Sequence, residues 1–352
     1  MNYYLKTNVF EQALNRIRYL FDEFENITVS FSGGKDSTVV LNLALIVARE
    51  KGRLPLKVVF IDQEAEWQTV IDYIRRTMSR PEVEPLWFQM PIKIFNATSS
   101  QSEWLYCWED GKEAEWIREK EPNSIKVNRY GTDRFAELFP AITDVEFGGQ
   151  KACAIAGVRA EESYNRRQGL TSFATYKHVT WGNKWGKEGI FTFYPIYDWS
   201  YKDVWAAIHR NGWEYCQIYD YMWQYGVPVS QMRVSNVHHE TAVKTLYYLQ
   251  EIEAGTWEKI TARINGINTA GHLKGNAFDV PKQLPYMFAD WREYRDHLLK
   301  NLIAGGEAQE RFRKKFEQMD RVYHDLPIKD EMYKVQISAI LTNDYHLTKL
   351  GN

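Results

Sequence analysis

The chain has 352 residues, of which 44% are hydrophobic, and its 44 Lys and Arg face 46 Asp and Glu, for a formal net charge of -2. These totals predict a globular protein with a sizeable core, built as one large or two modest domains. With so small a net charge, the protein as a whole is not attracted electrostatically to nucleic acid or to an anionic membrane. Nucleic acid is therefore not indicated as a partner.

Strands and helices alternate in the first part of the chain. Short apolar runs predict strands at 27–31, 56–62 and 86–90. Apolar residues at helical spacing predict helices at 8–24, 39–48 and 66–78. This order is typical of a parallel sheet with helices on both faces.

The periodicity weakens between about 92 and 150, which predicts a Trp-rich insertion of short helices and loops. Two more strands are expected at 151–159 and 190–197, and a helix follows in which Ser200 and Asp203 resemble a capping box and Gly212 marks the end. The last part of the chain is mostly helical, with helices expected at 239–264, 288–303 and 307–323.

The expected fold class is therefore α/β, a doubly wound, mostly parallel sheet with a helical C-terminal region. We expect a domain over 1–235, with the insertion at about 92–150, and a helical region over 236–352.

Cysteine use points to a reducing compartment. Cys107, Cys153 and Cys216 are far apart and form no C-x-x-C pair, so neither an iron–sulfur cluster nor a structural zinc is expected. Cys153 is expected in the core, whereas Cys107 and Cys216 are candidates for partial exposure. The first residues lack the features of a signal peptide, and no run is long and apolar enough to span a bilayer. We expect a cytoplasmic protein without a membrane partner.

The turn between the first strand and its helix carries the most specific pattern. It contains Ser32, Gly33, Gly34, Lys35, Asp36, Ser37 and Thr38. Glycines let backbone amides approach an anion, the helix N-terminus adds partial positive charge, and Lys35 adds a full one. The hydroxyl groups add donors, so the turn suits a di- or triphosphate. It is not a Walker A loop, because Asp36 follows Gly34-Lys35, and it lacks the G-x-G-x-x-G fingerprint.

SGGKDS (32–37) matches S-G-G-x-D-S, and the turn thereby resembles the pyrophosphate-binding PP-loop of the ATP-pyrophosphatase superfamily. The resemblance implies an adenine nucleotide alpha hydrolase-like fold in which domain 1–235 binds nucleotide. It also implies that the loop holds the pyrophosphate part of ATP or the phosphate of a related adenine nucleotide. The alternative is an ordinary glycine turn with a capping serine.

Two further segments resemble the PAPS reductase-like family of that superfamily. GVRAEESYNRR (157–167) is similar to its G-[IVL]-R-x-x-E-S-x-x-R segment, and 194–227 is similar to its P-I-x-D-W-x-x-x-D-V-W and Y-D-x-x-Y-x-x-G segments. The resemblance implies nucleotide-binding roles for Gly157, Arg159, Glu162, Arg166 and Arg167. Arginines suit phosphate or sulfate, and Glu162 would orient one of them. A solvated, charged helix start is the alternative.

Asp62 stands where the family has its D-T-G-x-x-F-P-E-T segment, which implies a place near the ribose or adenine. A carboxylate at a helix N-terminus is the alternative. The stretches YGVPVSQMRVSN, TWEKITARINGIN and LTNDYH resemble the branch that includes the immunoglobulin-binding regulator protein of enterobacteria. That resemblance implies a ParB-like protein partner.

Unlike the reductases, the chain has no E-C-G-L-H segment and no cysteine after Cys216, which disfavours thiol-dependent sulfonucleotide reduction. We expect adenylyl transfer from ATP with pyrophosphate release, with Lys35, Asp36 and Arg159 as catalytic residues. Mg²⁺ would be held by phosphates, with Asp36 or Asp62 as candidate ligands. Binding or conversion of a sulfonucleotide and a non-enzymatic, nucleotide-gated regulatory role are alternatives. The acceptor and a homo-oligomeric state stay open.

Overall fold

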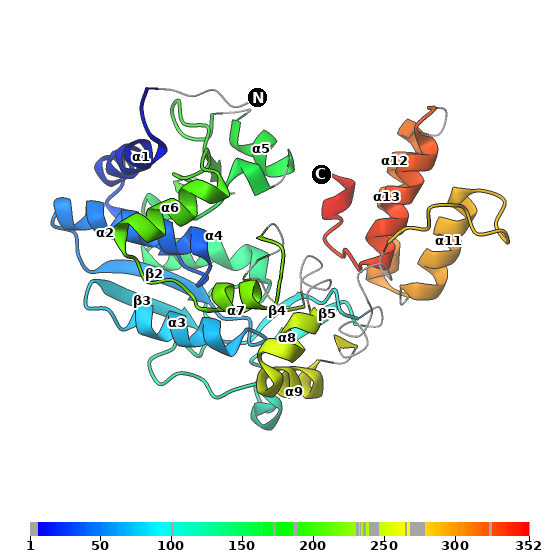
Figure 1. Cartoon of the computed structure of the whole chain (residues 1–352), viewed down its shortest axis with the longest axis horizontal. Helices are drawn as coiled ribbons and strands as arrows, with labels where there is room; N and C mark the ends of the chain where they lie inside the picture. Colours follow the sequence, from blue (N-terminus) through cyan, green and yellow to red (C-terminus); the bar gives the residue numbers. More distant parts are fainter. Residues whose placement is uncertain are drawn as a thin grey trace. The chain divides into compact units, whose positions relative to one another are not determined.

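A computed structural model describes residues 6–99, 102–162, 164–171, 174–185, 189–229, 232, 234, 237–238, 246–264, 266–267, 279–303, 305–323 and 326–351. The chain divides into two compact units (Figure 1). Unit 1 comprises Met1–Ile92, Trp108–Asp110 and Glu119–Val234, and unit 2 comprises Lys93–Cys107, Gly111–Arg118 and Ser235–Asn352. Parts of the insertion expected at 92–150 thus belong to unit 2.

Unit 1 is built on a six-stranded sheet in the order β3-β2-β1-β6-β8-β7. The strands are β1 (Asn26–Ser30), β2 (Leu56–Ile61), β3 (Val83–Phe88), β6 (Ala152–Ile155), β7 (Gly182–Lys184) and β8 (Ile190–Phe193). All neighbours are parallel except β7, which runs antiparallel to β8 at the edge. The five expected strands and the mostly parallel sheet are confirmed. The edge strand β7 was not expected, because Gly-Asn-Lys carries no apolar run.

The helices of unit 1 are α1 (Val9–Glu23), α2 (Lys35–Glu50), α3 (Gln68–Met78), α4 (Phe135–Glu146), α5 (Tyr164–Thr171), α6 (Tyr201–Asn211) and α7 (Ile218–Gln224), with the 3₁₀ helix η2 (Ala160–Glu162). The 3₁₀ helix η1 (Glu113–Glu115) belongs to unit 2. Helix α2 begins at Lys35, earlier than the apolar spacing indicates, because the polar loop residues form its first turn. It is buried on most sides, since β1, α1 and α6 all pack against it. The Ser200–Asp203 capping box and the left-handed Gly212 of α6 are confirmed.

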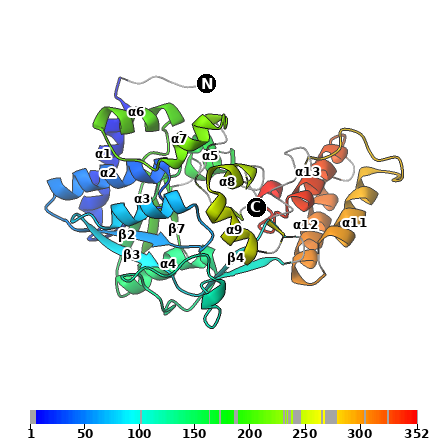
Figure 2. The same ribbon diagram turned by 60° about the horizontal axis from the view of Figure 1, so that its bottom comes forward.

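The order of the strands creates a switch point between β1 and β6. The chain moves outward from β1 through β2 to β3, then returns to place β6 on the other side of β1. Right-handed crossovers therefore put α2 and α3 on one face and α4 on the other, as Figure 2 shows. The loops after β1 and β6 diverge at this point, which is where open α/β sheets bind ligands.

Unit 2 contains β5 (Trp104–Cys107), which pairs with β4 (Ile92–Phe95), and a set of helices: α8 (Leu246–Ile252), α9 (Ala254–Arg263), α11 (Trp291–Leu302), α12 (Glu307–Tyr323), α13 (Lys329–Leu341) and η6 (Thr348–Leu350). Its core gathers Trp291, Phe312, Phe316, Ile337 and Tyr345. The helices at 288–303 and 307–323 are confirmed. The single helix expected at 239–264 is wrong, because Glu253 separates α8 from α9, and 239–245 lie outside the described residues.

Helix α13 was not expected. Its sequence, KDEMYKVQISAIL, does not gather its apolar residues on one stripe, although Tyr333, Ile337 and Ile340 are buried. Within the part of the chain that the structure describes, no helix combines the length and apolar character needed to cross a bilayer.

Candidate functional site

The loop after β1 turns sharply because two glycines allow it. Gly33 has φ +72°, and a Cβ there would lie 3.0 Å from Cγ1 of Val70, so a side chain would be strained and crowded. Gly34 is extended and caps α2, whose first residue is Lys35. The chain thus passes from strand to helix with its backbone close to the sheet edge.

Hydroxyl groups hold this loop together. Ser37 Oγ donates to the Gly34 carbonyl at 2.9 Å and accepts from the Ser32 amide at 3.2 Å. Thr38 is fully buried, with its hydroxyl 3.1 Å from that of Tyr73, while Ser32 is exposed. In this structure the hydroxyls of Ser37 and Thr38 stabilise the loop. The ligand contacts expected for Ser32, Ser37 and Thr38 stay predictions.

The loop also presents amides that the protein does not use. Among the described residues, the backbone N–H groups of Gly33, Gly34, Asp36 and Ser37 donate to no protein acceptor, and the first α-helical bond is from Thr38 N–H to the Gly34 carbonyl. Amides at a helix N-terminus, next to a residue of positive φ, favour the binding of an anion.

Asp36 joins two cations at the loop. Its Oδ2 accepts from Lys35 Nζ at 2.9 Å, and its Oδ1 accepts from Arg159 Nε at 2.5 Å. Arg159 is only 5% exposed and also donates to Glu161 Oε2 at 2.7 Å. Burial would lower the pKa of Arg159, but Asp36, Glu162 and Glu161 together raise it above its ordinary value. Arg159 therefore keeps its positive charge beside the loop.

Gly157 lets the segment after β6 approach the loop. A Cβ at Gly157 would lie 2.7 Å from the carbonyl carbon of Asp36 and 2.9 Å from the Ser37 amide nitrogen. Val29 pairs in register with Ile155, so the two strands end side by side and bring Gly157 against the start of α2. The glycine is thus required for backbone contact.

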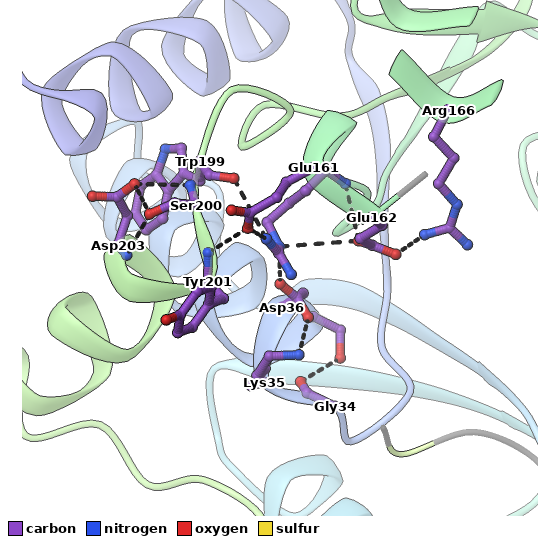
Figure 3. Close-up of polar contacts among 12 residues, drawn as sticks. Gly34, Lys35, Asp36, Glu161, Glu162, Arg166, Trp199, Ser200, Tyr201 and Asp203 are labelled. Carbon is purple, nitrogen blue, oxygen red and sulfur yellow. Dashed lines mark hydrogen bonds and ion pairs between the residues drawn. The ribbon is translucent and has the colours of Figure 1, made fainter. Parts of the chain in front are cut away.

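The remaining charged residues of this segment differ in their placement. Glu162 accepts the Arg159 amide at 3.1 Å and forms an ion pair with Arg166 (Figure 3). Its expected role in nucleotide binding stays a prediction. Arg167 is exposed and makes no ion pair with another described residue. Arg159 thus lies at the loop, and Arg166 is linked to it through Glu162.

Helix α6 supports the site from its N-terminus. Glu161 accepts the Tyr201 amide at 2.7 Å, which joins Arg159 to the first turn of α6. Trp205 lies edge-on against the ring of Tyr219, with centroids 5.3 Å apart.

Asp62 is a buried structural carboxylate. It is fully buried and accepts from the Glu64 amide, from Trp87 Nε1 and from Gln89 Nε2 at 2.9 to 3.0 Å. The nucleotide-binding and metal-binding roles expected for it stay predictions. Searched over the described residues, no group of three or more His, Cys, Asp or Glu side chains is arranged to hold a metal ion.

The three cysteines form no disulfide and are fully buried. The expectation of partial exposure for Cys107 and Cys216 is wrong, because both are packed in the interior, and Cys153 lies in β6 as expected. Burial raises the pKa of the Cys153 thiol, which keeps it protonated.

Sequence reasoning missed two residues of the site. Glu161 follows Arg159 by two positions but differs in no visible way from its neighbour Glu162. Tyr219 is part of the quoted Y-D-x-x-Y segment, and its hydroxyl accepts the Lys35 amide at 3.0 Å. The sequence of this segment does not predict the contact, because only the tertiary structure brings α7 next to the loop.

Two family models and a curated relative match this chain. The model of the phosphoadenosine phosphosulfate reductase domain matches residues 26–225, and that of a domain of unknown function (DUF3440) matches residues 226–351. Uncharacterized protein YbdN of Escherichia coli (strain K12) is 32% identical over 320 residues, which cover 85% of this chain and 76% of that protein.

More distant similarities are also found. Sulfate adenylyltransferase subunit 2 of Vibrio vulnificus (strain YJ016) is 23% identical over 220 residues, 59% of this chain and 65% of the subunit. The crystal structure of phosphoadenylyl-sulfate (PAPS) reductase from Candida auris, a phosphate complex, has 15% identity and a TM-score of 0.37 and covers 65% of this chain and 89% of that one. Because this TM-score is low, the fold class rests on the sheet topology and the family match.

Proposed function

The chain belongs to the phosphoadenosine phosphosulfate reductase domain family, and from this premise we propose that it binds ATP or a related adenine nucleotide and cleaves it at the α-phosphate. The observation that carries the proposal is the set of unused amides beside Lys35 and Arg159 at the β1–β6 switch point. This donor set suits the pyrophosphate part of a nucleotide.

In the proposed reaction, an acceptor oxygen attacks the α-phosphorus and forms a new P–O bond. The bond from that phosphorus to the bridging oxygen breaks, and pyrophosphate leaves with the electron pair. Negative charge grows on the leaving group, so catalysis depends on neutralising it. Lys35 and the loop amides do this directly, and Arg159 adds a positive charge close by.

Asp36 keeps these cations in place before the nucleotide arrives. It pairs with both Lys35 and Arg159, so neither side chain is left as an uncompensated charge. When phosphates enter, Lys35 can exchange Asp36 for a phosphoryl oxygen, while the buried Arg159 stays held by Glu161 and Asp36. Asp36 and Arg159 thus position the loop, and Lys35 contacts the phosphates.

Magnesium fits this site only as an ion held mainly by the nucleotide. Mg²⁺ is bound through one or two carboxylates together with phosphates and water. Asp36 is the carboxylate at the loop, its side chain is 17% exposed, and each of its oxygens accepts one hydrogen bond and retains a lone pair. When bound, the ion would neutralise charge on the phosphates.

A protein thiol has no part in the proposed reaction, because all three cysteines are buried. The nucleophile therefore belongs to the acceptor.

A second candidate is binding or conversion of adenylyl sulfate or its 3′-phosphorylated form. The family match and the exposed cations of Arg166 and Arg167 favour it, since a sulfate or an additional phosphate needs further positive charge. Calorimetry with ATP and with each sulfonucleotide distinguishes the two proposed functions. The true substrate is expected to bind at least about tenfold more tightly than the other nucleotides.

A third candidate is a nucleotide-gated regulatory partner of a ParB-like protein. Trp223 and Tyr225 are 66% and 50% exposed at the end of α7, the helix whose Tyr219 contacts the loop. A pull-down of the ParB-like protein with and without ATP tests this role. The regulatory role also requires that the protein release no pyrophosphate from ATP.

The proposed cleavage is tested by measuring pyrophosphate release from ATP. The wild type is expected to release pyrophosphate, and Lys35→Ala and Asp36→Ala are each expected to lose most of this activity. Arg18→Ala is the control, because Arg18 pairs with Glu50 on the surface, away from the loop. Full turnover by both loop variants contradicts the proposal.

A further inference from the structure

The hydroxyl of Tyr219 lies directly on the phosphate loop. Tyr219 is 4% exposed, and its oxygen accepts the Lys35 amide at 3.0 Å. The same oxygen would be 3.6 Å from a Cβ on Gly34, and the ring centroid is 5.6 Å from Lys35 Nζ. One phenol therefore contacts both the main chain and the side chain of the lysine.

The phenol of Tyr219 accepts hydrogen bonds, but its own O–H lacks an acceptor among the described residues. Burial raises the pKa of Tyr219 well above its ordinary value, so the group keeps its proton. Its oxygen accepts backbone amides from Lys35 and Val234. Within the described part of the chain, the O–H itself donates to no acceptor. A buried donor without an acceptor is unfavourable, and a ligand oxygen would satisfy it.

The ring is held in place before any ligand arrives. Trp205 lies edge-on against it at an interplanar angle of 87°, and Ile218 and Met222 of the same helix are buried. The hydroxyl therefore needs no ordering when it meets a ligand, and it stands next to the amides that the protein leaves unused.

We propose that the Tyr219 hydroxyl donates a hydrogen bond to a phosphoryl oxygen of the nucleotide held at residues 32–38, an inference that rests on the proposed function. The hydroxyl contacts the phosphate chain of the nucleotide and does not contact the base. It therefore contributes to the binding of ATP and of free pyrophosphate, and contributes nothing to the binding of adenosine.

The test compares Tyr219→Phe with Tyr221→Phe by calorimetry with ATP, pyrophosphate and adenosine. Tyr221 lies on the same helix, its side chain is 38% exposed, and it makes no side-chain hydrogen bond with another described residue. Tyr219→Phe is expected to lower the affinity for ATP and for pyrophosphate by about tenfold or more, because a hydrogen bond to a charged group is lost. Its affinity for adenosine should be unchanged. Tyr221→Phe should bind all three as the wild type does.

Two outcomes overturn the inference alone: unchanged affinity of Tyr219→Phe for pyrophosphate, or an equal loss for ATP and adenosine, which indicates a structural role. Failure of the wild type to bind ATP or pyrophosphate overturns the proposed function as well. If Tyr219→Phe does not fold, a crystal structure of the wild type with ATP decides. A phosphoryl oxygen within about 3.2 Å of the hydroxyl supports the contact, and a hydroxyl turned away from the phosphates contradicts it.

Discussion

Replacing Gly157 by alanine perturbs the site through one added methyl group. The new Cβ would lie 2.7 Å from the Asp36 carbonyl carbon, 2.8 Å from its oxygen and 2.9 Å from the Ser37 nitrogen. All three are backbone atoms at the start of α2, so no flexible side chain can move aside. Either the loop or the segment that carries Arg159 must shift.

The size of the effect follows from these distances. Carbon atoms in contact prefer about 3.5 Å or more, so the two backbones must separate by roughly 0.8 Å. Overpacking of this kind costs about 1–3 kcal/mol of unfolding free energy. A displacement of about 1 Å at a reacting centre can lower a rate roughly 100-fold, so we expect Gly157→Ala to lose more activity than stability.

The assay is pyrophosphate release together with ATP affinity and urea unfolding. Gly169→Ala is the matched control: Gly169 lies in α5, and a Cβ there would meet no atom within 4 Å. It should keep wild-type activity and gain up to about 1 kcal/mol of stability, because alanine is the better helix former. If Gly157→Ala turns over as well as Gly169→Ala, close backbone contact is not what builds the site.

Two further predictions concern stability in each unit. Burial raises the pKa of Tyr73 from 10.0 to about 12, so above pH 10 the unfolded chain loses this proton while the folded chain keeps it. The free energy of unfolding is expected to fall by about 2–3 kcal/mol between pH 10 and 12 because of this group. Urea titrations of Tyr73→Phe should show a smaller fall over the same range than the wild type. An equal fall in both proteins would contradict the raised pKa of Tyr73. In unit 2, Phe312 is fully buried, and Phe312→Ala should cost about 3–5 kcal/mol, whereas Tyr286→Ala, at a residue 95% exposed, should change thermal unfolding little. Equal melting temperatures for these two variants would refute the packing argument.

Much of unit 1 could be predicted from sequence because its signals are local. Buried parallel strands give continuous apolar runs, and the glycines of the loop mark a turn whose need for positive φ the structure confirms at Gly33. The capping box of α6 is likewise a short-range pattern, readable from Ser200 and Asp203 alone.

The rest depends on contacts between distant segments. Glu161 resembles Glu162 in sequence, and only the fold shows that Glu161 ties Arg159 to the α6 N-terminus. Tyr219 comes 184 residues after the amide it contacts. Asp62 follows a strand as a ligand-binding carboxylate would, yet Trp87 and Gln89 of the neighbouring strand region enclose it.

The central claim is that the loop amides and Lys35 hold the phosphate chain of an adenine nucleotide. Competition calorimetry tests it most directly, with ATP titrated into the wild-type protein in the presence and absence of pyrophosphate, and with AMP for comparison. The account predicts that pyrophosphate competes with ATP and that AMP binds more weakly by at least about tenfold. Equal affinities for ATP and AMP, with no competition by pyrophosphate, would contradict it.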